Sequence, residues 1–276
     1  MESDRVNISY LLNKDVADDK DYLIQSFQVG HMFDKIAAIG DSMSSGSING
    51  TGHWNCTWLS FLAKRWNCSL RRHYTKGGCA TYWWLINQSN IGLGNMLADN
   101  RIYDAYFIAM GHNDQGMITG QNHILSVGSA TDTPAAVTID DTDPTNIVTS
   151  VPDGLSFCSY YKAIIEQIRI MAPKAMIFCL PEYDSLMAYS NPAIRQAVID
   201  IAEYYRDNGD SLIFHLETGG VPDDELVFTG HYSAQGYQYI AKRIDEEVNR
   251  VLYEHRGDPD LHLYGGYYLS NEASDR

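Results

Sequence analysis

Four short apolar runs place the tightest limits on what this chain can fold into. They are residues 35–40 (KIAAIG), 104–110 (DAYFIAM), 174–180 (KAMIFCL) and 211–216 (SLIFHL). Their apolar residues are continuous rather than alternating, which is typical of parallel strands covered on both faces of a sheet. A fifth candidate strand, residues 70–75, carries charged side chains. We therefore expect it nearer an edge of the same sheet.

Segments with helical spacing of apolar residues lie between these runs. They are residues 53–66, 160–171, 192–205 and 233–255. Pro173 ends the second segment, and Pro192 suits an early turn of the third. Strands that alternate with helices favour an α/β fold with right-handed crossovers.

Residues 116–151 follow neither pattern. This stretch is rich in Thr, Asp, Ser, Gly and Pro, so we interpret it as a long surface excursion of the kind that often has a function. Its acids Asp140, Asp141 and Asp143 lack the spacing of a calcium loop, which favours solvated carboxylates. We find no linker or repeat, and we expect one domain over 34–256, an N-terminal extension over 1–33 packed on it, and a tail over 257–276.

The charge balance excludes whole classes of partner. The chain of 276 residues has 20 Lys and Arg against 35 Asp and Glu, a net charge of −15. This charge repels nucleic acid and anionic membrane surfaces, so we expect neither as a partner. No secretory pattern opens the sequence, and the five cysteines form no metal or disulfide pattern. We therefore expect reduced thiols and a cytoplasmic location.

Small and polar residues follow the predicted strands. Because ligands of open α/β sheets bind beyond the carboxyl ends of the strands, these residues are the candidate site. They are Gly40-Asp41-Ser42, Lys76-Gly77-Gly78 and Gly111-His112-Asn113-Asp114, with Gly230-His231-Tyr232-Ser233 before the last helix.

These segments contain the parts of a serine hydrolase. The hydroxyl of Ser42 needs a base to take its proton, and the imidazole of His231 suits this task at neutral pH. The oxyanion that follows needs fixed donors, which the backbone N–H of Gly78 and the side-chain amide of Asn113 could supply. Lying at strand ends, these groups would be held on a rigid frame.

The same residues resemble the SGNH hydrolases, the GDSL-type esterases and lipases. Gly40-Asp41-Ser42 matches the first block of that family, Gly78 the second (with Gly77 as the alternative), Gly111–Asp114 the third, and His231 through Gly236-Tyr237 the last. The resemblance implies a three-layer, flavodoxin-like α/β/α sandwich with a mainly parallel five-stranded sheet. It also implies ester hydrolysis with Ser42 as nucleophile, Gly78, Asn113 and the Ser42 N–H as oxyanion donors, and His231 as general base, without cofactor or metal.

One position departs from the family pattern. The family places an Asp three residues before the His, and Phe228 stands there in this chain. Asp223, Asp224 and Glu225 lie nearby without the usual offset. We therefore expect a working Ser–His dyad, with either a backbone carbonyl or an acid from a shifted turn orienting the imidazole.

Each singled-out residue also has a structural interpretation. Ser42 could begin a turn, Asn113 and Asp114 could cap a helix, and His231 could be a surface histidine. We prefer capping for Asp114 and packing for Cys79. Of the aromatic residues Tyr82, Trp83 and Trp84, we expect at least one in the core and one beside an acyl or sugar pocket.

We interpret the chain as an esterase for small acyl groups, preferably acetyl, on a carbohydrate or a similar scaffold. Its expected partner is a small-molecule ester, and a homo-oligomer stays open. The alternatives are a non-catalytic carbohydrate- or small-molecule-binding module on the same fold, which Phe228 suggests, and a nucleotide binder using residues 42–52. The second lacks the phosphate-loop spacing and has an unfavourable charge.

Overall fold

A parallel sheet of five strands forms the centre of the molecule. The computed structural model describes residues 33–48, 51–86, 91–121, 123–140, 142, 148–181, 191–219, 221, 226–227, 231–255, 258 and 261. The strand order is β11-β10-β5-β1-β4, and all four pairings are parallel. The strands are β1 (Lys35–Gly40), β4 (Leu70–Thr75), β5 (Ala105–Ala109), β10 (Met176–Cys179) and β11 (Ile213–His215).

The five strands predicted from sequence are confirmed, including the edge position of β4. In β1, Ala37 and Ile39 pack into one hydrophobic core, and Ile36 and Ala38 pack into a second core on the opposite face. Both faces are apolar because both are covered, which explains why the strand sequences do not alternate.

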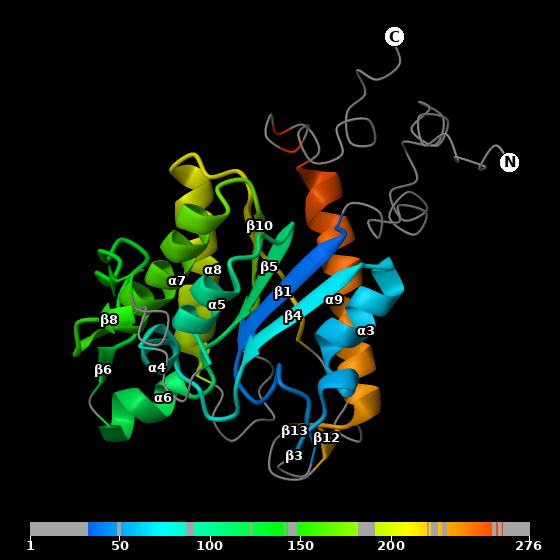
Figure 1. The fold of residues 1–276 in the computed structure, drawn as a ribbon, viewed down its shortest axis with the longest axis horizontal. Helices are drawn as coiled ribbons and strands as arrows, with labels where there is room; N and C mark the ends of the chain where they lie inside the picture. Colours follow the sequence, from blue (N-terminus) through cyan, green and yellow to red (C-terminus); the bar gives the residue numbers. More distant parts are fainter. Residues whose placement is uncertain are drawn as a thin grey trace, which may run out of the picture.

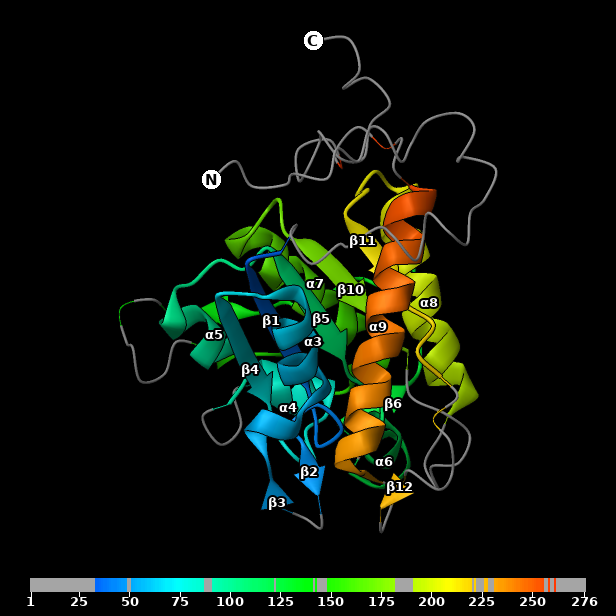
Figure 2. The ribbon, with the colours of Figure 1, turned by 90° about the vertical axis from the view of Figure 1, so that its right-hand side faces the viewer.

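Helices cover both faces of the sheet. Figure 1 shows α4, α5, α7 and α8 on one side and α3 and α9 on the other, and Figure 2 shows α3 and α9 together in front of the sheet. The helices are α4 (Thr81–Leu85), α5 (Leu93–Asp99), α7 (Phe157–Met171), α8 (Pro192–Asp207), α3 (Trp58–Trp66) and α9 (Ala234–Glu254). The fold is therefore a three-layer α/β/α sandwich, as predicted.

Capping residues set where these helices begin. The helix predicted from residue 53 starts at Trp58, because the side chain of Thr57 accepts the N–H of Ser60 at 2.9 Å. The preceding residues form a separate 3-10 turn, η2 (Trp54–Cys56). Ser156, Asn191 and Ser233 cap α7, α8 and α9 in the same way.

The stretch predicted as a surface excursion contains short elements that pack on the domain. They are α6 (Asp114–Gly116), η4 (Met117–Gln121), β6 (Ile124–Ser126), which pairs with β9 (Leu155–Ser156), and β7 (Thr138–Ile139), which pairs with β8 (Val148–Ser150). The buried ammonium of Lys162 on α7 donates to the carbonyls of Ala130 and Asp132 at 2.8 and 2.7 Å. This cation ties the excursion to α7. Asp141 and Asp143 lie outside the described residues.

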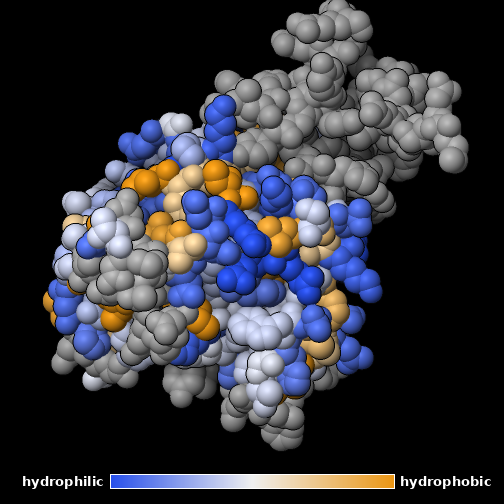
Figure 3. All heavy atoms as spheres, in the orientation of Figure 1, coloured by the Kyte–Doolittle hydropathy of each residue, from blue (hydrophilic) through white to orange (hydrophobic). Residues whose placement is uncertain are grey.

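Hydrophilic side chains cover much of the surface visible in Figure 3. On the face seen in Figure 3, apolar patches are small and separated by hydrophilic side chains. Within the described ranges, no helix combines the length and apolarity needed to cross a bilayer. All five cysteines are described and are free thiols. Residues 1–32 and 262–276, most of the predicted extension and tail, lie outside the described ranges.

Candidate active site

Three strands end at the same level of the sheet. Gly40, the last residue of β1, is in register with Thr75 of β4 and Ala109 of β5. Because neighbouring strands run parallel and in register, Ser42, Gly77 and Gly111 each lie two residues beyond this shared edge of the sheet. The sequence motifs that follow these strands therefore meet in space.

The loop after β1 holds Ser42 tightly. A Cβ on Gly40 would lie 2.6 Å from the Ser44 hydroxyl oxygen and 2.9 Å from the carbonyl oxygen of Ala109, so only glycine fits at this position. Ser42 itself is half-buried. The buried Asp41 carboxylate accepts the N–H of Met43 at 2.8 Å, which stabilises the turn around Ser42.

Asn113 connects this loop to the other two. Its amide nitrogen donates to the carboxylate of Asp41 at 2.9 Å and to the carbonyl of Cys79 at 3.2 Å. One side chain thus ties the loops that follow β1, β4 and β5. The structure brings Ser42, Asn113 and the glycine turn together, as the sequence predicted.

The glycines after β4 form a tight turn. Cys79 donates its N–H to the carbonyl of Lys76 at 3.2 Å, and Gly78 has φ +74° at the third position, which is the geometry of a type II turn. Both glycines are exposed. A Cβ on Gly77 would lie 3.7 Å from the Cβ of Ser42, whereas one on Gly78 would meet nothing within 4 Å. The alternative glycine of the sequence analysis therefore lies beside Ser42, while the role of Gly78 stays a prediction.

Asp114 has the capping role that we preferred. Its buried carboxylate accepts both the N–H and the hydroxyl of Thr81, the first residue of α4. The residue before Thr81 provides no side-chain cap of its own. Asp114 therefore anchors α4, and with it the glycine turn, next to Asn113.

Cys79 is not a competing nucleophile. Burial raises the pKa of its thiol to about 12, and the carboxylates of Asp114 and Asp41 raise it further than Lys76 lowers it. A thiol with this pKa is protonated at neutral pH and is not reactive. The packing role predicted for Cys79 is confirmed.

His231 lies on a small hairpin beside the nucleophile loop. Strand β13 (His231–Tyr232) pairs with β12 (Leu226–Val227) and contacts β2 (Ser47–Ile48), which follows the Ser42 turn. Figure 1 shows β12 and β13 at the end of the molecule where β3 (Thr51–Gly52) also lies. Phe228 and the acids at 223–225 lie outside the described residues.

A tyrosine fastens the last helix to the same loop. The hydroxyl of Tyr237, near the start of α9, lies 3.3 Å from the carbonyl oxygens of both Ser42 and Ser47 and donates to them. The ring of Tyr237 is buried, and burial with the nearby Asp41 raises the pKa of its hydroxyl, which therefore stays a donor. The segment that carries His231 is thus attached to the segment that carries Ser42.

Comparison with known proteins bears on the fold alone. No family model and no curated protein matches the sequence. Similar solved structures include a family two carbohydrate esterase from Clostridium thermocellum (TM-score 0.52, 17% identity, 79% of this chain and 64% of that one). A second is the acetyl xylan esterase Est2A from Butyrivibrio proteoclasticus (TM-score 0.50, 15% identity, 81% of this chain and 64% of that one). A third is a protein assigned as a GDSL-like lipase from Bacteroides ovatus (TM-score 0.51, 16% identity, 79% of this chain and 98% of that one).

The chain has the fold of the SGNH, or GDSL-type, hydrolases. It spans just under two thirds of the two carbohydrate esterases and nearly all of the lipase-like protein.

Two residues that contact the site, Asp41 and Tyr237, have no role predicted from the sequence. Asp41 stands inside the Gly-Asp-Ser motif, and Tyr237 stands inside the Gly-Tyr pair, so the motif contained both. Their partners are distant in sequence, which is why their contacts could not be predicted. No group of three metal-ligating side chains occurs in the described part of the chain.

The aromatic residues after the glycine turn have separate roles. Trp84 is fully buried and donates its ring N–H to the carbonyl of Tyr74 at 2.9 Å, so it is the expected core residue. Tyr82 is half-buried and stacks on His123 with 5.0 Å between ring centroids. A pocket role for Tyr82 or Trp83 stays a prediction.

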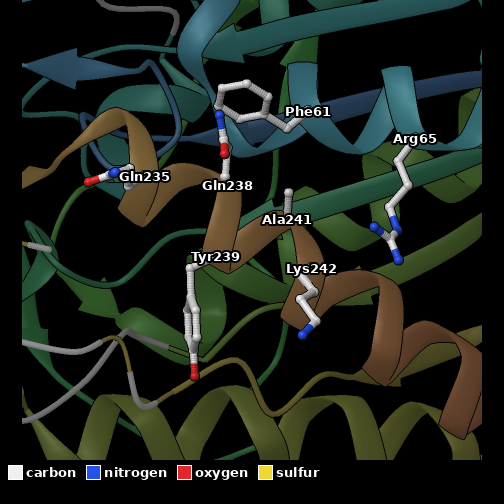
Figure 4. A pocket seen from close by; sticks show the side chains of 7 residues that line it. All are labelled: Phe61, Arg65, Gln235, Gln238, Tyr239, Ala241 and Lys242. Carbon is white, nitrogen blue, oxygen red and sulfur yellow. The ribbon is translucent and has the colours of Figure 1, made fainter.

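An open groove of about 700 Å³ lies between α3 and α9. Figure 4 shows Arg65 of α3 and Lys242 of α9 among the side chains that line it. Arg65 pairs with Asp245, and Lys242 lies 3.6 Å from Glu246. Because each cation has an acidic partner, the groove has no excess of positive charge for an anionic ligand.

Proposed function

We propose that this chain is a serine esterase for small acyl esters, with acetyl esters on a carbohydrate as its preferred substrates. The observation that carries the proposal is the meeting of Ser42, the glycine turn and Asn113 at one edge of the sheet. The carbohydrate part draws on the solved structures of the same fold, a carbohydrate esterase in complex with cellohexaose and an acetyl xylan esterase.

In the proposed reaction, the hydroxyl oxygen of Ser42 attacks the acyl carbonyl while His231 takes its proton. The tetrahedral intermediate then collapses, and the alcohol leaves with the proton that His231 returns. Water, deprotonated by His231, attacks the acyl-enzyme, and the acid is released as Ser42 regains its proton. The attachment of α9 to the Ser42 loop through Tyr237 supports this pairing of residues.

The amide of Asn113 is suited to stabilise the transition state selectively. One of its hydrogens is directed to the Asp41 carboxylate, a strong charged acceptor, and the other to the neutral carbonyl of Cys79 at 3.2 Å. An oxyanion is a better acceptor than a neutral carbonyl. As charge develops, the second N–H therefore exchanges its hydrogen bond to the Cys79 carbonyl for one to the oxyanion, while the proton stays on the amide, and such an interaction raises kcat.

The test compares Ser42→Ala with Ser69→Ala. Ser69 is an exposed serine at the opposite end of the sheet, whose hydroxyl donates to the carbonyl of Asp34. We expect Ser42→Ala to abolish hydrolysis of p-nitrophenyl acetate and labelling by a fluorophosphonate, with a nearly unchanged melting temperature. Ser69→Ala should keep both activities.

Retained turnover in Ser42→Ala would reject the assignment. A folded wild-type protein that neither hydrolyses the ester nor takes the label at Ser42 would instead favour the non-catalytic binding module.

A further inference from the structure

A tryptophan outside the catalytic loops is unusually exposed. Trp54 of η2 is 47% exposed, whereas Trp58, Trp66 and Trp84 are buried. A single exposed aromatic side chain is common on protein surfaces, so a role for Trp54 has to be argued from its position and its contacts.

Trp54 lies next to the nucleophile loop. The N–H of His53 donates to the carbonyl of Gly46 at 2.9 Å, and the N–H of Ser47 donates to the carbonyl of Ser42 at 3.3 Å. These two bonds connect η2 to the Ser42 turn through only a few residues. The main chain of η2 therefore begins close to the Ser42 turn, and we expect a group bound on the Trp54 ring to lie near a substrate at Ser42.

The tryptophan is also held in place. Its carbonyl accepts the hydroxyl of Ser60 at 2.5 Å, and its ring packs against His73 with 5.4 Å between centroids. His73 is fixed by contacts of its Nε2 with Thr57 and Ser60, and burial lowers its pKa to about 4. A neutral, largely buried histidine ring thus packs against Trp54 at an interplanar angle of 54°. Binding there would cost little ordering of the side chain.

Polar groups border this platform. Arg71 of β4 donates to the hydroxyl of Ser60 at 2.9 Å and to the amide oxygen of Asn55 at 3.2 Å. Asn55, Arg71 and His53 are all exposed. A flat apolar surface with hydrogen-bonding groups at its edge matches a pyranose ring, which has a C–H face and hydroxyls around its rim.

Other ligands fit the platform less well. Nucleic acid bases also stack on tryptophan, but the net charge of −15 repels their phosphates. A lipid surface needs a contiguous apolar patch, and the neighbours of Trp54 on either side, His53 and Asn55, are polar and exposed. Of these three ligand classes, a neutral carbohydrate fits the platform best.

We propose that Trp54, with Asn55 and Arg71 at its edge, forms a carbohydrate-binding subsite beside Ser42. The inference rests on the proposed function for its place in catalysis, because the subsite would hold the sugar that carries the ester. Sugar binding itself can be measured without catalysis.

The binding test uses the full chain with Ser42→Ala, titrated calorimetrically with cellohexaose and with xylohexaose. We expect one of these sugars to bind. We expect Trp54→Ala to weaken that binding at least tenfold and Trp54→Phe to weaken it less, because Phe keeps a ring. Ile170→Ala, which removes an apolar side chain that is 70% exposed on α7, should change nothing. Equal binding by Trp54→Ala, or no binding of either sugar by the parent, would overturn the subsite.

The kinetic test uses chains with Ser42 intact. For acetylated xylo-oligosaccharides, Trp54→Ala should lower kcat/KM at least tenfold through a higher KM. For p-nitrophenyl acetate, which is too small to span both positions, kcat/KM should stay within twofold. Equal losses on both substrates would show a structural effect and contradict the subsite. If the wild-type chain hydrolyses neither ester, the proposed function fails, while the calorimetric result still decides the subsite.

Discussion

At the scale of single residues, the two hydrogens of the Asn113 amide have different proposed roles: the one bonded to Asp41 holds the loops together, and the one bonded to Cys79 stabilises the oxyanion. We expect Asn113→Ala to lower kcat for p-nitrophenyl acetate by about 10² to 10³-fold, because an oxyanion donor contributes on the order of 3 kcal/mol to the transition state. KM should change little, since the ground-state carbonyl needs this donor less. Steady-state kinetics of the purified variant measures both constants.

Asn249 of α9 provides the matched control. Asn249 is buried, whereas Asn113 is half-buried, and the amide nitrogen of Asn249 likewise donates to a carbonyl and lies near a carboxylate, both of Asp245. Asn249→Ala should reduce the melting temperature as Asn113→Ala does but keep kcat. A decrease of less than tenfold in kcat for Asn113→Ala would assign Asn113 a purely structural role.

The sequence could identify residues of the site but not their contacts. Ser42 and Asn113 stand in short local motifs, so their positions at strand ends followed from the pattern. The bond from Asn113 to Asp41 joins residues 72 apart. The choice between Gly77 and Gly78 depends on which face of a turn lies toward Ser42, and two adjacent glycines carry no information about this.

At the scale of elements, Tyr237 links α9 to the nucleophile loop. We expect Tyr237→Phe to lower kcat about tenfold, because losing two bonds to the Ser42 and Ser47 carbonyls lets the hydroxyl of Ser42 move relative to His231. Misplacement by even 1 Å can cost this much. The rate of fluorophosphonate labelling should decrease in proportion, and KM should stay unchanged.

Tyr160→Phe tests whether any buried tyrosine hydroxyl would have this effect. The hydroxyl of Tyr160 also donates to two carbonyls, those of Pro152 at 2.9 Å and His123 at 3.3 Å, the first just after the 116–151 excursion and the second within it. We expect a similar loss of thermal stability but unchanged labelling. Equal loss of labelling in the two variants would refute a positioning role for Tyr237.

The elements that the sequence predicted are those with strong local patterns. The buried strands are short but belong to continuous apolar runs, and the helices α7, α8 and α9 are long enough for helical spacing of apolar residues to be clear. The helices α4 and α5 have five and seven residues, too few for a periodic pattern. The short strands after residue 116 depend on pairing partners elsewhere in the chain, which a local pattern does not contain.

At the scale of the whole molecule, two effects of acid on stability oppose each other. Protonation of carboxylates reduces the net charge of −15 and so relieves self-repulsion. His73 acts in the other direction, because burial, with Arg71 and Arg72 nearby, lowers its pKa from 6.5 to about 4. The unfolded chain therefore takes up more protons at this histidine than the folded chain between these pH values. Its contribution to stability is complete above pH 6.5 and is lost as the pH falls toward 4.

We expect His73→Gln to remove this second effect, because Gln does not titrate. With the pKa values above, His73 alone lowers the free energy of unfolding of the wild type by about 2 kcal/mol between pH 7.5 and pH 5. Urea unfolding at both pH values measures the change, and the wild type should lose about this much more than the variant. Identical pH dependence in the two proteins would mean that His73 titrates normally.

Catalysis should respond differently to acid. His73 stays neutral from pH 5 to 8, so a fall in kcat/KM toward acid pH that is present in both proteins is assigned to His231. A rate that is flat over this range would exclude His231 as the general base.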